Sequence, residues 1–219
     1  MRIVLLAAFL LVGSAVAAPF AIQLGDTRLG LDAPPGFADT GFTGSPRLQE
    51  LAESLTSASN RILLFAISDA DLRRFTLGDA PELRRYMIAV TPKGLERERV
   101  SPAAFGAFVR DSLAALGSAP AAGDLQKYLD AQPPGKTSLL AELRREPGVV
   151  SVLQGTRAPA QRRSSEAPQY ALSTTTLMLL RGKALNLSVY TLYENAADLD
   201  WVRATTARWV DDIARLNNR

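Results

Sequence analysis

Alternating apolar and polar positions predict two antiparallel hairpins, one near each end of the folded part of the chain. The first covers residues 20–33 and turns at a Gly-Asp pair. The second covers residues 170–193, where two long alternating runs flank an Arg-Gly-Lys turn. Unbroken apolar runs at 62–67 and 86–90 predict central strands buried on both faces, and a shorter strand is expected at 149–153. The pattern therefore favours a sheet with mainly antiparallel neighbours.

Three stretches with helical spacing accompany these strands. Ser-Pro pairs, which combine a cap residue with a first-turn proline, predict helix starts for the stretches 46–58 and 102–116. The last helix, 198–216, is expected to begin at Asp198 as its N-cap. Its apolar stripe repeats at intervals of three and four residues and consists of Leu199, Val202, Thr206, Trp209, Ile213 and Leu216. We therefore expect an α/β (α+β) fold, in which a mainly antiparallel central sheet is flanked by these helices.

The middle of the chain, at about 117–168, is predicted to be a loop-rich insertion in a single α/β domain. Short amphipathic pieces at 125–129 and 139–143 are separated by a Pro-Pro-Gly turn, which favours a helix–turn–helix linker. The stretch Gly155–Pro168 is rich in Ala, Pro, Arg and Ser. It is predicted to be a mobile surface loop.

The first residues have the pattern of a cleavable signal peptide. Arg2 precedes an apolar run at 3–12, and small residues follow at 15–17, where a signal peptidase reads the chain. The run is shorter than the roughly 20 residues that a membrane-spanning helix needs. We expect residues 1–17 to be removed near Ala17, which leaves a domain at 18–219 in the periplasm or outside the cell. No integral membrane segment is then expected.

Composition limits the chemistry that such a domain can perform. The chain has no Cys and no His, which excludes disulfides, thiol catalysis, a Ser-His-Asp triad and metal sites built on Cys or His. We predict no metal and no cofactor. The formal charge is +3, or about +2 without Arg2, and no basic cluster is long enough for a nucleic-acid arm. The expected partner is an envelope protein or ligand rather than a nucleic acid.

One short motif resembles the end of a phosphate-binding loop. Pro133-Pro134-Gly135-Lys136-Thr137 matches its last positions, but the first glycine of the motif would fall on Asp130. The preceding segment is also predicted to be helical, where the motif needs a strand. A Ser–Lys pair between Ser138 and Lys136 is a second interpretation. A helix cap and a solvated charge account for these two residues more simply.

An acidic group between the long hairpin and the last helix is the first candidate site. Glu194, Asp198 and Asp200 lie close together in sequence. Two carboxylates about 5–9 Å apart can hydrolyse a glycosidic bond, and three carboxylates can also bind Ca²⁺. Against both readings, Asp198 already has a role as a helix cap, and acidic residues stabilise a helix start.

A tryptophan and an arginine cluster complete the candidates. Trp201 lies one position off the apolar stripe of the last helix, so it is a candidate for stacking on a ligand. Arg157, Arg162 and Arg163 are candidates for binding an anionic polymer or a lipid headgroup. The competing interpretation is a solvated, flexible loop. We assign no catalytic residue.

The order of elements resembles the Mog1/PsbP-like fold: an opening hairpin that ends at Pro34-Pro35-Gly36-Phe37, a helix, central strands, a hairpin and a closing helix. The closing part, from Val189-Tyr190 through Trp201 and Trp209 to Asn217, resembles exported proteins of Gram-negative bacteria. The resemblance to that fold implies an adaptor or assembly protein without catalysis.

These observations lead to one principal hypothesis and two alternatives. The principal hypothesis is a non-catalytic periplasmic protein that binds a partner or assists envelope assembly. The first alternative is a carboxylate-based hydrolase of cell-wall or other glycans, built on the acidic group. The second alternative is attachment to an anionic membrane through the arginines at 157–163, which high salt would weaken.

Overall fold

The computed structural model describes residues 19–120, 125–159 and 169–218. Within these residues, a two-stranded hairpin and a seven-stranded antiparallel sheet make up the β-structure. The strands are β1 (Phe20–Leu24), β2 (Thr27–Leu31), β3 (Phe37–Asp39), β4 (Asn60–Ser68), β5 (Arg85–Pro92), β6 (Thr137–Glu146), β7 (Val149–Arg157), β8 (Tyr170–Leu180) and β9 (Lys183–Tyr193). The predicted class, a mainly antiparallel sheet flanked by helices, is confirmed.

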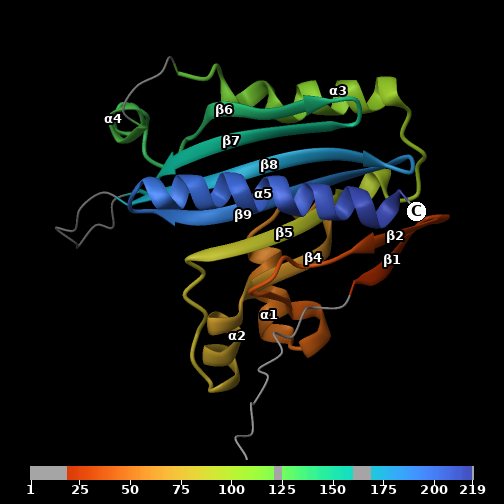
Figure 1. Cartoon of the computed structure of the whole chain (residues 1–219), viewed down its shortest axis with the longest axis horizontal. Coiled ribbons are helices and arrows are strands. Elements are labelled where there is room, and N and C mark those ends of the chain that lie inside the picture. The colour runs from red at the N-terminus through yellow and green to blue at the C-terminus, as the bar shows by residue number, and fades with distance from the viewer. Residues whose placement is uncertain (1–18, 121–124, 160–168, 219) are drawn as a thin grey trace, which may run out of the picture.

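The large sheet has the order β3-β4-β5-β9-β8-β7-β6, so the last hairpin lies at its centre. Helix α5 (Ala196–Asn217) lies along one face (Figure 1). Helices α1 (Pro46–Ser54) and α2 (Asp69–Thr76) pack against β4 and β5, and α3 (Pro102–Leu113) packs against β7, β8 and β9. The remaining helical pieces are η1 (Thr40–Thr43), η2 (Lys93–Leu95), η3 (Ala114–Leu116) and α4 (Leu125–Asp130).

The main core forms where α5 crosses β8 and β9. The predicted stripe faces the sheet, and Val202, Trp209 and Ile213 are fully or almost fully buried. Burying a large apolar side chain contributes about 1.5–3 kcal/mol, so this stripe holds the helix firmly. The start of α5 differs from the prediction by a few residues. Asn195 is the N-cap, and Asp198 is the third helical residue of a capping box.

The β1–β2 hairpin is fastened to the far end of α5. The Asn217 side chain accepts a hydrogen bond from the Gly30 N–H and donates one to its carbonyl, both at 2.9 Å. Trp209 Nε1 donates to the Asp32 carbonyl at 2.8 Å. These long-range bonds satisfy the backbone groups of a hairpin that lies outside the large sheet.

The middle of the chain differs most from the sequence prediction. Leu125–Asp130 is helical, as expected, but the piece at 139–143 belongs to strand β6 and not to a second helix. Two register shifts, at Leu139/Ala141 and Glu142/Arg144, interrupt its pairing with β7. The described part of 117–168 thus supplies two strands of the main sheet. Residues 160–168, most of the predicted mobile loop, lie outside the described residues.

Two smaller corrections concern α1 and β4. Helix α1 ends at Ser54 rather than at residue 58, and Ser45 precedes it without a side-chain cap bond. Strand β4 is not central: it lies next to β3, which is an edge strand.

Among the described helices, none combines the length and the apolarity needed to cross a bilayer.

Candidate functional site

The edge of β4 is open along much of its length. Strand β3 pairs with β4 only where Phe37–Asp39 lies opposite Ala66–Ser68. The preceding part of β4, Asn60–Phe65, pairs with β5 on one side and has no strand on the other within the described residues. Backbone groups on an unpaired strand edge are free to pair with another chain. The short edge strand β3 therefore leaves Asn60–Phe65 without a strand neighbour, although the Phe65 carbonyl accepts from Thr40 Oγ1 and the Asn60 N–H donates to the Ser57 carbonyl.

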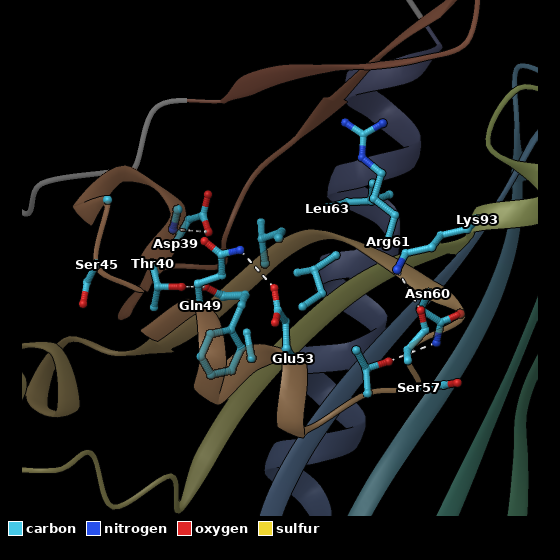
Figure 2. A pocket seen from close by; sticks show the side chains of 18 residues that line it. Asp39, Thr40, Ser45, Gln49, Glu53, Ser57, Asn60, Arg61, Leu63 and Lys93 are labelled. Carbon is cyan, nitrogen blue, oxygen red and sulfur yellow. Dashed lines mark hydrogen bonds between the residues drawn. The ribbon is translucent and has the colours of Figure 1, made fainter. Parts of the chain in front are cut away.

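A groove of about 610 Å³ lies against this edge. Its apolar part comes from Ile62, Leu63, Leu64 and Phe65 of β4 together with Ala52 of α1. Helix α1 and η1 supply a polar border, and Figure 2 shows the hydrogen-bonded side chains that project from them. Binding sites for ligands commonly have volumes of about 300–1,000 Å³, with an apolar lining and a few polar groups. This groove matches that description.

Hydrogen bonds fix both ends of the groove. At one end, Thr40 Oγ1 donates to the Phe65 carbonyl at 3.0 Å. At the other end, Asn60 Nδ2 donates to Thr56 Oγ1 at 3.0 Å, and Lys93 Nζ donates to the Ala58 carbonyl at 2.7 Å. Side chains held in this way form a site that is already shaped before a ligand binds.

Two acidic and two basic side chains line the groove. Glu53 accepts a hydrogen bond from Gln49 at 2.9 Å, and the Arg61 guanidinium forms an ion pair with Glu96. Burial raises the pKa of Asp39, although hydrogen bonds from the Gly41 and Phe65 N–H groups oppose this shift. Lys93 lies at the end of the groove next to Asn60, and Asp39 lies at the end next to Phe65. A basic side chain therefore lies at one end and an acidic one at the other, with Glu53 and Arg61 also lining the groove.

The structure brings two of the three predicted acidic residues together. Glu194 and Asp198 both line a polar hollow of about 460 Å³, with Arg84 and Arg85. Each carboxylate has an arginine partner: Glu194 pairs with Arg84, and Asp198 Oδ1 lies 2.9 Å from Arg85. The exposed Asp200 does not line the hollow.

The environment of Asp198 favours its charged form. Burial alone would raise the pKa, but hydrogen bonds from the Glu194 and Asn195 N–H groups and from Arg85 outweigh it, so the pKa is lowered. A general acid in glycoside hydrolysis needs the opposite, because its carboxyl must stay protonated until it donates. The geometry at Asp198 instead serves the capping box and the ion pair.

The predicted stacking residue Trp201 is half-buried and already has two neighbours. The Phe37 ring lies 6.0 Å away between centroids, and the Arg85 guanidinium lies 4.3 Å from the centre of the indole ring. A cation at this distance is attracted to the π-face. Trp201 thus connects the end of β3 with the arginine that neutralises Asp198.

The arginine cluster is described only in part. Arg157 donates to the Asp130 carbonyl at 3.0 Å, and its guanidinium lies 3.5 Å from the Asp130 carboxylate. It therefore fastens α4 to the end of β7. Arg162 and Arg163 lie outside the described residues, so attachment to anionic membranes stays a prediction.

The segment that resembles the end of a phosphate-binding loop, together with the Lys136 and Ser138 pair, lies in a helix–turn–strand. Gly135 lies in the turn before β6, and Ser138 is a buried residue of that strand rather than a helix cap. Within the described residues, no group of three potential ligands among Asp, Glu, His and Cys is placed to hold a metal ion.

Reasoning from the sequence missed the groove because its opening depends on pairing between distant segments. The run at 62–67 indicates a strand buried on both faces, and this is correct for residues 63–67, whereas Ile62 is only partly buried. The place where β3 stops pairing is set by the turn of η1 that begins at Thr40. The polar residues Asn60 and Arg61, just before the apolar run, were the only local signal.

Comparisons with known proteins find similar solved structures but no family. No protein-family model and no curated protein matches the chain. Among solved structures, the Ran-binding protein Mog1p of Saccharomyces cerevisiae is similar, with 14% identity, a TM-score of 0.41 and coverage of 91% of this chain and 94% of that one. A point mutant of protein Mog1 has the same identity and coverage with a TM-score of 0.40.

Similarity of this degree carries no site, ligand or partner over to this chain. Membership of an exported family of Gram-negative bacteria stays a prediction from the sequence.

Proposed function

We propose that this chain is a non-catalytic binding protein of the bacterial periplasm and that the groove between α1 and β4 is its binding site. The observation that carries the proposal is the groove of about 610 Å³ beside a strand edge without a neighbour at Asn60–Phe65. A pre-shaped groove with an apolar lining and an accessible backbone is suited to binding a partner.

The chemistry around the groove also supports binding rather than catalysis. Arg61 is bound to Glu96, and Glu53 is bound to Gln49. No His or Cys is present in the chain to act as a base or nucleophile near neutral pH. The acidic group at Glu194 and Asp198, on which the hydrolase hypothesis depends, is neutralised by two arginines.

The location rests on the first residues of the chain. A basic residue, an apolar run and a small-residue cleavage site are the three parts of a secretory signal. A domain delivered in this way meets envelope proteins, so an envelope protein, including one involved in assembly, is the partner that we propose.

Site-specific photo-crosslinking in living cells tests the proposal. A photoreactive amino acid replaces Gln49, an exposed residue on the groove border, and in a matched control it replaces Arg208, an exposed residue of α5. We expect one reproducible adduct from the periplasmic fraction with Gln49 and none with Arg208. Adding Thr56→Trp, which fills the groove, should remove that adduct. An adduct that survives Thr56→Trp, or a chain that keeps its first residues in the cytoplasm, would contradict the proposal.

A further inference from the structure

We infer that a second cavity, the pocket at the open end of the β1–β2 hairpin, binds a small organic ammonium ion with an aromatic body, and that Asp32 neutralises the charge of this ligand. The pocket has a volume of about 370 Å³. Among the described residues it shares only Asp39 with the groove between α1 and β4. The inference goes beyond the proposed function, because it concerns another site and a small molecule instead of a protein.

Segments that are distant in sequence meet around this pocket. Phe20 begins β1 and lies opposite Leu31, so Phe20 and Asp32 flank the end of the hairpin that has no turn. Phe42 comes from η1 and Leu72 from α2, and both line the pocket. Pockets for small ligands commonly have volumes of about 300–1,000 Å³, with a mainly apolar lining and a few polar groups. This pocket lies at the small end of that range.

Two phenylalanines determine the shape of the ligand's body. Phe42 is 74% exposed. Its ring lies 5.5 Å from that of Phe20 between centroids, and the two planes are at 85°. Aromatic rings favour edge-to-face or offset contacts at distances of this order, and both side chains line the pocket. A ring bound there would contact both of them and remove apolar surface of Phe42 from water.

Asp32 supplies a negative charge that has no cation beside it. Its Oδ1 atom is buried and has no hydrogen-bond partner within the described residues. Burial raises the pKa of the carboxyl, and the charge of Asp212 adds to this shift, although Asp212 itself is paired with Arg215. A buried charge without a counterion costs free energy. A cation in the pocket offsets this cost from the side that Asp32 lines, without touching Oδ1, because charges attract over several ångströms in apolar surroundings.

Asp39 makes the pocket more negative and selects a cation over an anion. Its carboxylate accepts hydrogen bonds from the Gly41 N–H at 3.1 Å and from the Phe65 N–H. These donors hold it in place without neutralising it. Among the described residues that line the pocket, none is basic.

The apolar walls select an organic cation over a metal ion. A metal ion would leave those walls unfilled, and the described residues place no three potential ligands among Asp, Glu, His and Cys together. A flexible lysine side chain of a partner protein would lose more rotational freedom on entering than a compact aromatic amine does. The occupant that satisfies both the rings and the carboxylates is therefore an aromatic amine in its ammonium form.

The experiment is an NMR titration of the folded, ¹⁵N-labelled mature chain with three probes of similar shape and different charge. These are 2-phenylethylamine, 2-phenylethanol and 3-phenylpropionate. We expect the amine to shift the amide signals of Ala33, Ala38 and Thr43, which line the pocket, with a Kd of about 1 mM. The alcohol should bind about tenfold more weakly, because it lacks the charge-assisted contact. The carboxylate should cause no shifts there.

Three variants separate the charge from the apolar walls. Asp32→Asn should weaken the amine about tenfold and leave the alcohol unchanged. Asp200→Asn removes the same charge from an exposed position of α5 and should change neither. Phe42→Ala should weaken the amine and the alcohol by the same factor. Because the Phe42 side chain is largely exposed, this variant should keep the amide spectrum of the parent elsewhere.

Several results would overturn the inference. They are equal affinity for the amine and the alcohol, an equal effect of Asp32→Asn and Asp200→Asn, and no shifts at about 10 mM amine. Tighter binding of N-acetyl-lysine amide than of 2-phenylethylamine would also overturn it, by assigning the pocket to a basic side chain of a partner. Crosslinking through Gln49 reports on the groove separately, so the proposed function is tested independently of all these outcomes.

Discussion

Thr40 and Phe65 mark the point where strand pairing ends and the groove begins. Thr40 Oγ1 donates to the Phe65 carbonyl at 3.0 Å, and the threonine is buried with 6% of its surface exposed. A side-chain hydroxyl here replaces the backbone donor that a longer β3 would have supplied. Thr40→Val keeps the shape but removes this donor, which leaves a carbonyl without its partner at the groove.

We expect Thr40→Val to lower the free energy of unfolding by about 1–3 kcal/mol, the usual cost of an unsatisfied buried polar group. Urea unfolding monitored by tryptophan fluorescence measures this loss of stability. Thr27→Val is the matched control, because Thr27 lies in a strand but bonds only to the neighbouring, exposed Asp26. Its effect should stay within about 0.5 kcal/mol. Equal losses for both variants would show that the Thr40 bond has no special role.

Gly155 permits the close packing of α4 on β7. A Cβ atom at this buried position would lie 2.9 Å from methyl groups of both Leu129 and Leu140. Gly155→Ala therefore overpacks the site, and we expect a loss of about 1–3 kcal/mol in the free energy of unfolding.

The double variant with Leu129→Ala separates overpacking from a change in backbone freedom. Leu129→Ala alone should cost about 2–5 kcal/mol, because Leu129 is fully buried. The double variant should lose clearly less stability than the sum of the two single losses, since the new methyl group at residue 155 occupies space that the leucine has vacated. Strict additivity would indicate that Gly155 is needed for its backbone conformation instead.

The elements that the sequence predicts well are those in which the local pattern and the final contacts agree. In the hairpin of β8 and β9, every second residue from Tyr170 to Leu180 is buried, and the pairing of the two strands has no register shift. The register is then fixed, because a slip by one residue would turn every apolar side chain to the wrong face. The stripe of α5 is equally regular, so its burial follows from the sequence.

Strand β6 shows why other parts were missed. Its two register shifts each add a residue and reverse the alternation. The sequence from Leu139 to Leu143 therefore reads with helical spacing, although the backbone is extended. The groove was missed for a different reason: the strand predicted at 62–67 lies within β4, but the open edge at Asn60–Phe65 depends on where β3 stops, at Asp39, between 21 and 26 residues earlier in the chain.

The capping box of α5 should make stability sensitive to acid. The Asp198 carboxylate accepts hydrogen bonds from the Glu194 and Asn195 N–H groups at 3.0 and 3.2 Å, and its pKa in the folded protein is lowered from 3.8. A lowered carboxyl pKa stabilises the fold above the unfolded value and loses that contribution as the pH falls through the folded value.

We expect Asp198→Asn to lower the free energy of unfolding by about 1 kcal/mol at pH 7. The difference from the parent chain should shrink as the pH falls below 3.8, where the parent also loses its charge. Urea unfolding at several pH values measures this difference, and Asp200→Asn, at an exposed residue of the same helix, is the control. A constant difference at all pH values would assign the effect to shape rather than to charge.

Ionisation of Asp32 should change the stability of the fold in the opposite direction to ionisation of Asp198. Its Oδ1 atom is buried and has no hydrogen-bond partner in the described part of the chain. Burial raises the pKa above 3.8, the Ala33 N–H opposes this shift, and the nearby negative charge of Asp212 adds to it. A raised carboxyl pKa destabilises the folded state as the pH climbs through that pKa, because the ionised form is better solvated in the unfolded chain.

Asp32→Asn removes that ionisation, so the free energy of unfolding at pH 7 should rise by up to about 1 kcal/mol. Well below pH 3.8 the carboxyl is protonated in both states, and the gain should vanish there. Asp26→Asn in the same hairpin is the matched control. The pKa of Asp26 is lowered by hydrogen bonds from Thr27 and Lys183, so its removal should destabilise the protein at pH 7. Urea unfolding at pH 7 and near pH 3 distinguishes the two, and a loss of stability in Asp32→Asn at pH 7 would show that this carboxylate is held by a favourable partner.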